Sequence, residues 1–195
     1  MKIIAPDDVY GSGVDYLIPN IPDDFTYTSY FQFHEIDEWA APLYMWDWPD
    51  GSAYIQIELY YNSYGDTYLG IWGSDAEGND FQNFDEITTL TPDEWHKLNV
   101  TVSERDIAVS IDDVVVNIWT ATIDNPLRGL KYMEFWNDNQ VPGNDLWIDC
   151  AGWDGEMPRV VSVGAVHGDR ESEGGGIKRR EIIGAITNQR HFIDP

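Results

Sequence analysis

A strict alternation of apolar and polar residues between Asp93 and Asp113 constrains the fold of this chain more than any other feature. The apolar members of the alternation are Leu98, Val100, Val102, Ile107, Val109 and Ile111. A period of two residues is that of an extended strand with one buried face, and the polar stretch 103–106 interrupts it as a turn would. The segment therefore predicts a β-hairpin in a half-buried antiparallel sheet.

Other strand-like segments recur along the chain, with turn signals rich in Gly, Pro, Asn and Asp between them. They cover residues 24–33, 54–62, 67–73, 84–90, 114–120, 130–136 and 145–153. No segment has a sustained helical period with capping residues. Many short strands at this spacing predict an all-β fold, a two-sheet antiparallel jelly-roll sandwich.

The composition changes sharply after Met157. Residues 1–157 hold 26 of the 27 aromatic residues, whereas residues 158–195 hold only Phe192. We therefore predict a β-sandwich domain over 1–157 and a C-terminal extended arm over 158–195. The arm has two apolar stretches, 159–166 and 180–187, which are too short to form a core and so would pack on the domain, on another copy or on a partner. Disorder of the arm and a last sandwich strand at 159–166 are the alternatives.

Acidic residues dominate the charge of the chain, with 35 Asp and Glu against 11 Lys and Arg and a net charge of -24. They are spread along the sequence rather than clustered, which argues against a dedicated cation binder. Low Lys with abundant Asp resembles the proteins of extreme halophiles, whose charge repulsion is screened by salt. Nucleic acid is excluded as the main partner, because phosphate contacts need clustered Lys and Arg. No apolar run is long enough for a signal peptide or a membrane span.

The order of the strand motifs resembles the concanavalin A-like lectin/glucanase superfamily, especially its laminin-G-like branch. The motifs are "FTYTSYFQF" at 25–33, "PLYMW" at 42–46, "WHKLNVTV" at 95–102, "VSIDDVVV" at 109–116 and "LWIDCAGW" at 146–153. The resemblance implies that Trp95 plugs the core at the start of its strand and that His96 lies beside it on the sheet surface. Asp113 replaces the usual turn glycine, which the readiness of Asp to adopt left-handed conformations permits.

The resemblance would also allow an enzyme, but the glucanase signature E-x-D-x-E is absent. We assign no catalytic residue and expect a non-enzymatic protein. Four His and the single Cys150 have no zinc spacing and allow no intramolecular disulfide. We assign no metal ligand and no cofactor. Calcium is left open, because this superfamily often binds it and residues 75–80 and 137–145 are rich in side-chain oxygens; solvated acidic loops are the alternative.

Tryptophan is abundant, and three of these residues are candidates for carbohydrate binding. Trp46 and Trp48 are two residues apart, so they would share one face of a strand beside Asp47 and Asp50. Aromatic rings that stack on sugars next to carboxylates that hold hydroxyl groups are typical of glycan sites. Trp136, before an Asn- and Asp-rich loop, is the third candidate. The alternative is that these rings fill the sandwich core.

These features lead to three hypotheses for function. The first is a structural protein of a halophilic archaeal virus particle, in the capsid decoration, tail or baseplate, with a lectin-like domain that contacts host glycans. Its arm would bind other virion proteins or copies of itself, and its location would be the virion. The second is a secreted, extracellular carbohydrate-binding module of a halophile. The third is a glycoside-active enzyme. The first rests on analogy between folds.

We expect the stability of the domain to rise with salt, because molar salt shortens the screening length to about 3 Å and so weakens repulsion among its acidic residues. Circular dichroism or tryptophan fluorescence during thermal unfolding across a salt series measures this. A melting temperature that does not change from low to molar salt would contradict the halophile interpretation.

We also expect truncation after Met157 to leave a folded domain with a cooperative melt close to that of the full chain, because all but one of the aromatic residues precede this point. The truncated chain should lose its oligomeric state in light scattering. An aggregating or molten product would instead place the last sandwich strand within residues 158–195.

Overall fold

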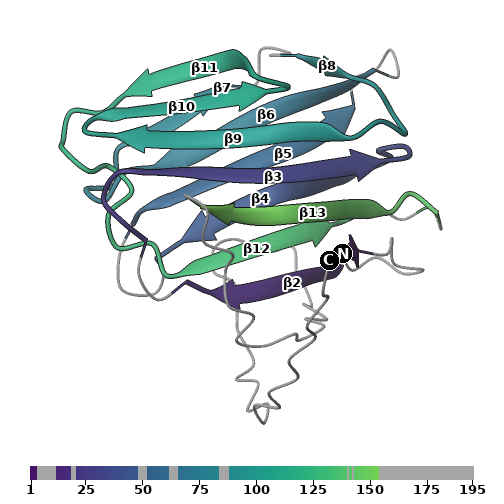
Figure 1. Cartoon of the computed structure of the whole chain (residues 1–195), viewed down its shortest axis with the longest axis horizontal. Coiled ribbons are helices and arrows are strands. Elements are labelled where there is room, and N and C mark those ends of the chain that lie inside the picture. The colour runs from purple at the N-terminus through teal and green to yellow at the C-terminus, as the bar shows by residue number, and fades with distance from the viewer. Residues whose placement is uncertain are drawn as a thin grey trace, which may run out of the picture.

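The computed structural model describes residues 1–3, 12–18, 21–47, 52–61, 66–83, 88–139, 141 and 143–153. These residues form thirteen strands in two stacked sheets (Figure 1). All of the strand pairs are antiparallel and the described residues contain no helix, so none of them provides a membrane-spanning helix. The predicted all-β, two-sheet antiparallel sandwich is confirmed.

The six-stranded sheet joins strands from both ends of the described chain. Its order is β1 (Lys2–Ile3), β13 (Leu146–Trp153), β3 (Phe25–Phe33), β9 (His96–Ser103), β10 (Asp106–Ile111) and β11 (Val114–Thr120). The seven-stranded sheet has the order β2 (Ser12–Leu17), β12 (Tyr132–Asn137), β4 (Trp39–Trp46), β5 (Tyr54–Tyr61), β6 (Thr67–Ser74) and β7 (Asp80–Asn83), and β8 (Thr89–Leu90) pairs with β6.

The core lies between the sheets and is made by alternate residues of each strand. In β3, β9 and β10 every second side chain is buried, and these buried positions include all of the apolar residues that the hairpin alternation predicted. Fully buried side chains such as Phe31, Leu98 and Ile57 each stabilise the fold by about 1.5–3 kcal/mol relative to exposure. The predicted hairpin, with its turn after Ser103, is confirmed.

The limits of several predicted strands differ from those observed. Of the segment predicted at 84–90, only β8 is a described strand, and residues 84–87 lie outside the described residues. The strands β1, β2 and β7 were not predicted. Residues 154–195 also lie outside the described residues, so the 1–157 boundary and the 158–195 arm stay predictions. Strand β11 forms one edge of the described six-stranded sheet, where it exposes Val114, Val115 and Ile118.

The positions of Trp95 and His96 are the reverse of those that the family resemblance implied. Trp95 is 49% exposed, whereas His96 is 5% exposed and packs against the rings of Phe31 and Phe33. The reason is the strand period: His96 is two residues before Leu98, so it shares the buried face of β9. The expectation of a core Trp95 and a surface His96 was therefore wrong.

The turn between β10 and β11 has the geometry that Asp113 was expected to tolerate. Asp112 and Asp113 have φ angles of 51° and 65°, and they link the opposed residues Ile111 and Val114. Positive φ at both central residues defines a type I′ turn, whose twist matches that of the flanking strands. An acidic pair therefore takes the place of the more common Asn-Gly or Asp-Gly.

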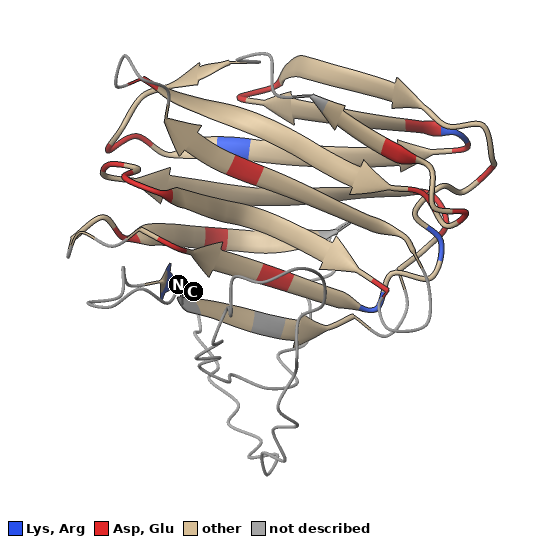
Figure 2. Cartoon of the chain, turned by 180° about the vertical axis from the view of Figure 1, so that it is seen from behind, with Lys and Arg blue, Asp and Glu red and all other residues tan. Residues whose placement is uncertain are grey.

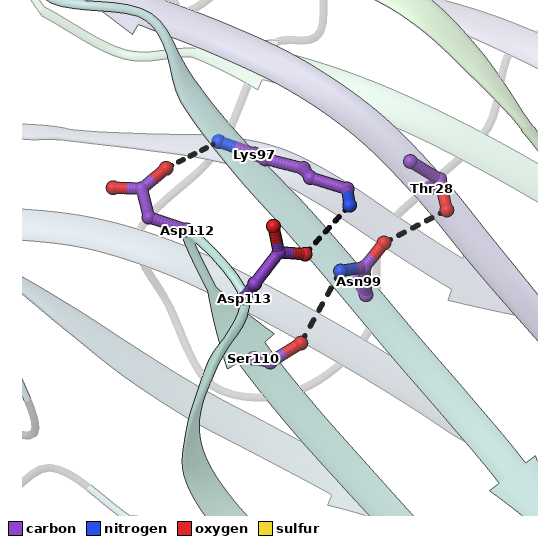
Figure 3. Close-up of polar contacts among 6 residues, drawn as sticks. All are labelled: Thr28, Lys97, Asn99, Ser110, Asp112 and Asp113. Atoms are coloured by element: carbon purple, nitrogen blue, oxygen red, sulfur yellow. Dashed lines mark hydrogen bonds and ion pairs between the residues drawn. The ribbon is translucent and has the colours of Figure 1, made fainter.

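The Asp112 carboxylate ties this turn to the start of β9 (Figure 3). One oxygen accepts a hydrogen bond from the Lys97 backbone N–H at 2.8 Å, and the other lies 2.9 Å from His96 Nδ1. His96 Nε2 lies 2.9 Å from the carbonyl oxygen of Thr91. Both ring nitrogens therefore face oxygens of neighbouring segments, and His96 has a structural role. Asp113 forms only an exposed ion pair, 2.6 Å from Lys97 Nζ.

We expect Asp112→Ala to lower the free energy of unfolding by about 2 kcal/mol, because it removes the hydrogen bonds to Lys97 and His96 and puts Ala at positive φ. Asp113→Asn is the matched control: it tolerates the same φ and removes an exposed ion pair, which should cost about 0.5 kcal/mol or less. Chemical denaturation of both variants measures the difference. Equal losses would show that Asp112 does not link the turn to β9.

Candidate functional site

The outer side of the seven-stranded sheet presents rows of aromatic and polar side chains. Residues directly opposite each other on paired strands share a face of the sheet. Trp46 of β4 lies opposite Tyr54 of β5 and Tyr132 of β12. In the parallel row two residues away, Tyr44 lies opposite Gln56 and Glu134.

The sequence of β5 explains how this face arises. Its inward residues are Ile55, Ile57 and Leu59, which are buried, and the residues between them point outward and are half-buried. The next strand, β6, adds Trp72 opposite Gln56 and Tyr68 opposite Tyr60. We call the following outward side chains of these strands the aromatic face: Trp39, Tyr44, Trp46, Tyr54, Gln56, Glu58, Tyr60, Tyr68, Trp72, Tyr132, Glu134 and Trp136.

Trp46 is on this face but is covered by its neighbours. Its ring stacks against Tyr44 with centroids 4.8 Å apart and against Tyr132 at 5.4 Å, and 6% of the residue is exposed. Because rings cover it from two sides, Trp46 offers little open surface to a sugar, and its part in carbohydrate binding stays a prediction. It supports the half-buried rings of Tyr44 and Tyr132. Trp48, its predicted companion, lies outside the described residues.

Trp136 belongs to the same face and is half-buried. Its indole lies against the backbone of Gly13 on the neighbouring strand β2, where a Cβ atom would collide with the ring. Its Nε1 is buried, and no described residue accepts a hydrogen bond from it. The structure therefore brings Trp46 and Trp136 to one face, as carbohydrate binding would require. It does not test whether either contacts a ligand.

Trp72 is the most open large ring of the aromatic face, with 38% of the residue exposed. Together with Gln56, Tyr44 and Glu134 it forms a row across four adjacent strands. Neighbouring strands are about 4.8 Å apart, so this row offers an indole, an amide, a phenol and a carboxylate at regular intervals. Sequence reasoning missed these residues. The signal was present in 54–60, where the polar members of the alternation are Tyr, Gln, Glu and Tyr.

The aromatic face is acidic rather than basic. The described strands of this sheet contain the acids Asp15, Glu58, Asp80 and Glu134 but no Lys or Arg. Figure 2 views this sheet from its outer side and shows acidic segments within its strands. Burial raises the pKa of the Tyr54 hydroxyl, and the nearby charge of Asp80 raises it further, so Tyr54 is a neutral hydrogen-bonding group at physiological pH.

The first loop considered for calcium uses its acidic oxygens internally. Asp75 Oδ1 accepts hydrogen bonds from the backbone N–H groups of Glu77 and Asn79, and Oδ2 accepts one from the Asn79 side chain, each at 2.9 Å. Burial acts to raise the pKa of Asp75, but these hydrogen bonds outweigh it, so the pKa is lowered. The carboxylate therefore closes the turn between β6 and β7.

The second loop has a similar internal network. Asn137 Nδ2 donates to the carbonyl oxygens of Ile3 and Asn144, and Asn139 Nδ2 donates to Asn137 Oδ1 at 2.8 Å. Asp145 pairs with Lys2 at 2.6 Å. Among the described residues, no group of three or more His, Cys, Asp and Glu side chains is arranged to hold a metal. The assignment of no metal ligand stays a prediction, with calcium as the alternative that was left open.

Comparison with known proteins identifies the fold. No family model matches the sequence, and no curated protein matches it. Among solved structures, the laminin alpha1 chain of mouse, domains LG4-5, is similar over 84% of this chain with a TM-score of 0.57 and 9% identity. This chain spans 45% of that laminin structure.

The solved structures of two enzymes are similar to this chain to a comparable degree. The apo Crh5 transglycosylase has a TM-score of 0.52 and 7% identity, over 75% of this chain and 69% of that one. A mutant of the alginate lyase Aly36B in complex with alginate trisaccharide has a TM-score of 0.51 and 11% identity, over 78% and 79%. At such identities the likeness establishes the fold alone. The chain has a concanavalin A-like, laminin-G-like jelly-roll fold.

Proposed function

We propose that this domain is a carbohydrate-binding module that holds a glycan against the aromatic face. The observation that supports this most strongly is the row of Trp72, Gln56, Tyr44 and Glu134 across four strands. The apolar side of a sugar ring stacks on an exposed aromatic ring, and its hydroxyl groups exchange hydrogen bonds with amide, phenol and carboxylate groups. One row of the sheet contains both kinds of group.

The structural neighbours support the same class of ligand. A structure of the same fold is described as a complex with an alginate trisaccharide, and another is a transglycosylase. We infer a glycan ligand from the side chains of the aromatic face. The inference agrees with the names of these two neighbours, which have the same fold.

We propose binding without turnover. The glucanase signature E-x-D-x-E, which puts paired acids on one strand, is absent from the sequence. The absence of this pair favours a binding site over the glycoside-active enzyme.

The virion protein and the secreted module of a halophile are two settings for the same face. On a virus particle the aromatic face would contact glycans of the host surface, and in a secreted module it would contact a polymer outside the cell. The particle setting further requires the predicted arm, 158–195, to bind neighbouring subunits. Both settings stay proposals, and each uses the same glycan contact.

We expect Trp72→Ala to weaken glycan binding by about tenfold or more, because it removes the most open stacking surface and about 1.4 kcal/mol corresponds to tenfold. Trp95→Ala is the matched control, because Trp95 is at least as exposed but precedes a strand of the other sheet. A glycan array selects the ligand, and calorimetry with the full chain then measures each affinity. Wild-type protein that binds no glycan, or equal losses in both variants, would contradict the proposal.

A further inference from the structure

We propose that the edge strand β11 is the docking site for the arm of a second copy of this chain, and that residues 159–166 of that copy add to β11 as a further strand of the six-stranded sheet. The site is independent of the proposed glycan contact, because the aromatic face belongs to the other sheet. It gives the predicted arm a defined partner and a defined position.

The backbone of β11 is placed to accept another strand. Of the described strands, only β10 pairs with it (Figure 1). The N–H of Ala121 donates to the carbonyl oxygen of Arg105 at 2.8 Å, and the direction of the backbone groups alternates along an antiparallel strand. The N–H and C=O groups of Ile118 and Thr120 therefore point away from β10, toward the position that a further strand would take.

The side chains of β11 lack the charges that discourage pairing at an edge. Val114, Val115 and Ile118 are 64%, 57% and 61% exposed, and the strand contains no charged residue and no proline. By contrast, β1, β2 and β7, which form the other ends of the two described sheets, each contain a charged residue. An apolar edge without charges is a site at which an extended segment adds to a sheet.

The sequence of residues 159–166, RVVSVGAV, suits this position. The stretch lies outside the described residues and contains four Val, whose branched side chains favour extended strands. Its one charged residue is Arg159, whereas the other apolar stretch of the arm, 180–187, contains Glu181. The stretch 159–166 therefore brings apolar side chains and no negative charge to β11.

Charge favours the arm over a second copy of β11 as the partner. Residues 1–157 hold 30 acidic and 5 basic residues, so direct pairing of two β11 strands would press two strongly negative domains together. Residues 158–195 hold 5 acidic and 6 basic residues. Residues 154–158 can hold the two domains apart by up to about 20 Å, well beyond the screening length of about 8 Å in 0.15 M salt. Docking through the arm therefore reduces the repulsion.

The length of the chain after β13 requires that the arm come from another copy. Trp153 ends β13 and starts a row of opposed residues that crosses the sheet through Tyr27, Val100 and Val109 to Asn117 of β11. A strand beyond β11 is five strand spacings from Trp153, about 24 Å along the sheet. Arg159 is six residues after Trp153, and six extended residues span at most about 22 Å. A chain cannot place 159–166 along its own β11.

Cross-linking between two separately made full-length chains tests the contact. Both chains have Cys150→Ser, which removes the exposed free thiol; one adds Ile118→Cys, and the other, labelled with ¹⁵N, adds Val163→Cys. After mixing at micromolar concentration and treatment with a short bismaleimide, we expect a covalent dimer of one labelled and one unlabelled chain in mass spectrometry. Leu17→Cys in place of Ile118→Cys is the matched control, since Leu17 is exposed on the edge strand β2 of the other sheet. It should give at most about a tenth of that dimer.

Other products overturn the proposal in distinct ways. A dimer of two Ile118→Cys chains in place of the mixed dimer would show that β11 pairs with β11. A cross-linked monomer from one chain that has both Ile118→Cys and Val163→Cys would show that the arm covers its own edge. A higher yield with Ile183→Cys than with Val163→Cys would assign the contact to 180–187. Equal yields in the Leu17→Cys control would show random collision.

Self-association of the full chain gives a second measurement without cross-linking. We expect Ile118→Lys, which adds the charge that this edge lacks, to raise the Kd of self-association at least about tenfold in sedimentation equilibrium. Leu17→Lys is the matched control and should leave the Kd unchanged. Circular dichroism shows whether both variants keep the wild-type fold, as expected for substitutions at exposed positions. A wild-type chain that stays monomeric up to about millimolar concentration, or an equal change in both variants, overturns the proposal.

Discussion

The direction in which each strand turns its side chains is the constraint on which the rest of this domain depends. A shift of one residue in a strand would exchange its buried and exposed faces. In β5 that shift would put Glu58 in the core and Ile57 in solvent. Burial of the apolar row therefore fixes the core and, by the same step, fixes which side chains form the aromatic face. The binding surface is a consequence of the register that the core imposes.

The outer faces of the two sheets differ in chemistry, and this difference favours one face for a ligand. On the six-stranded sheet, Thr28 Oγ1 donates to Asn99 Oδ1 at 2.8 Å, and Asn99 Nδ2 donates to Ser110 Oγ at 3.3 Å (Figure 3). Polar groups there pair with each other across the strands. On the seven-stranded sheet, rings such as Trp72 and half-buried carboxylates occupy the corresponding positions. The six-stranded sheet also has rings on its outer side, such as Tyr30 opposite Lys97 and Trp147 opposite Gln32, but the larger set of neighbouring rings is on the seven-stranded sheet.

The sequence predicted the fold class and most of the central strands because their alternation is strict, as it is at Leu98 and Val100. The predicted burial of Trp95 and His96 was reversed because it was taken from the family resemblance. The two-residue period of the strand, taken alone, puts His96 on the buried face. Trp46 was correctly placed on a strand, but one of the two rings that cover it, Tyr132, comes from a strand that is distant in the sequence. The row that ends at Trp72 could not be predicted for the same reason, since it depends on the register of four strands. The short strands β1 and β7 have too few residues for a period to be visible.

The pairing of β13 with β3 has a consequence for the order of folding. β3 is among the first strands of the chain, but one of its two neighbours is the last described strand. Until β13 has been synthesised, β3 is an open sheet edge whose inward Phe31 and Phe33 lack part of their cover. Contacts between such distant segments close slowly, and uncovered edges invite pairing with other chains in the meantime. During translation this protein should therefore be most prone to aggregate just before residues 146–153 leave the ribosome, and its yield should depend on how long that interval lasts.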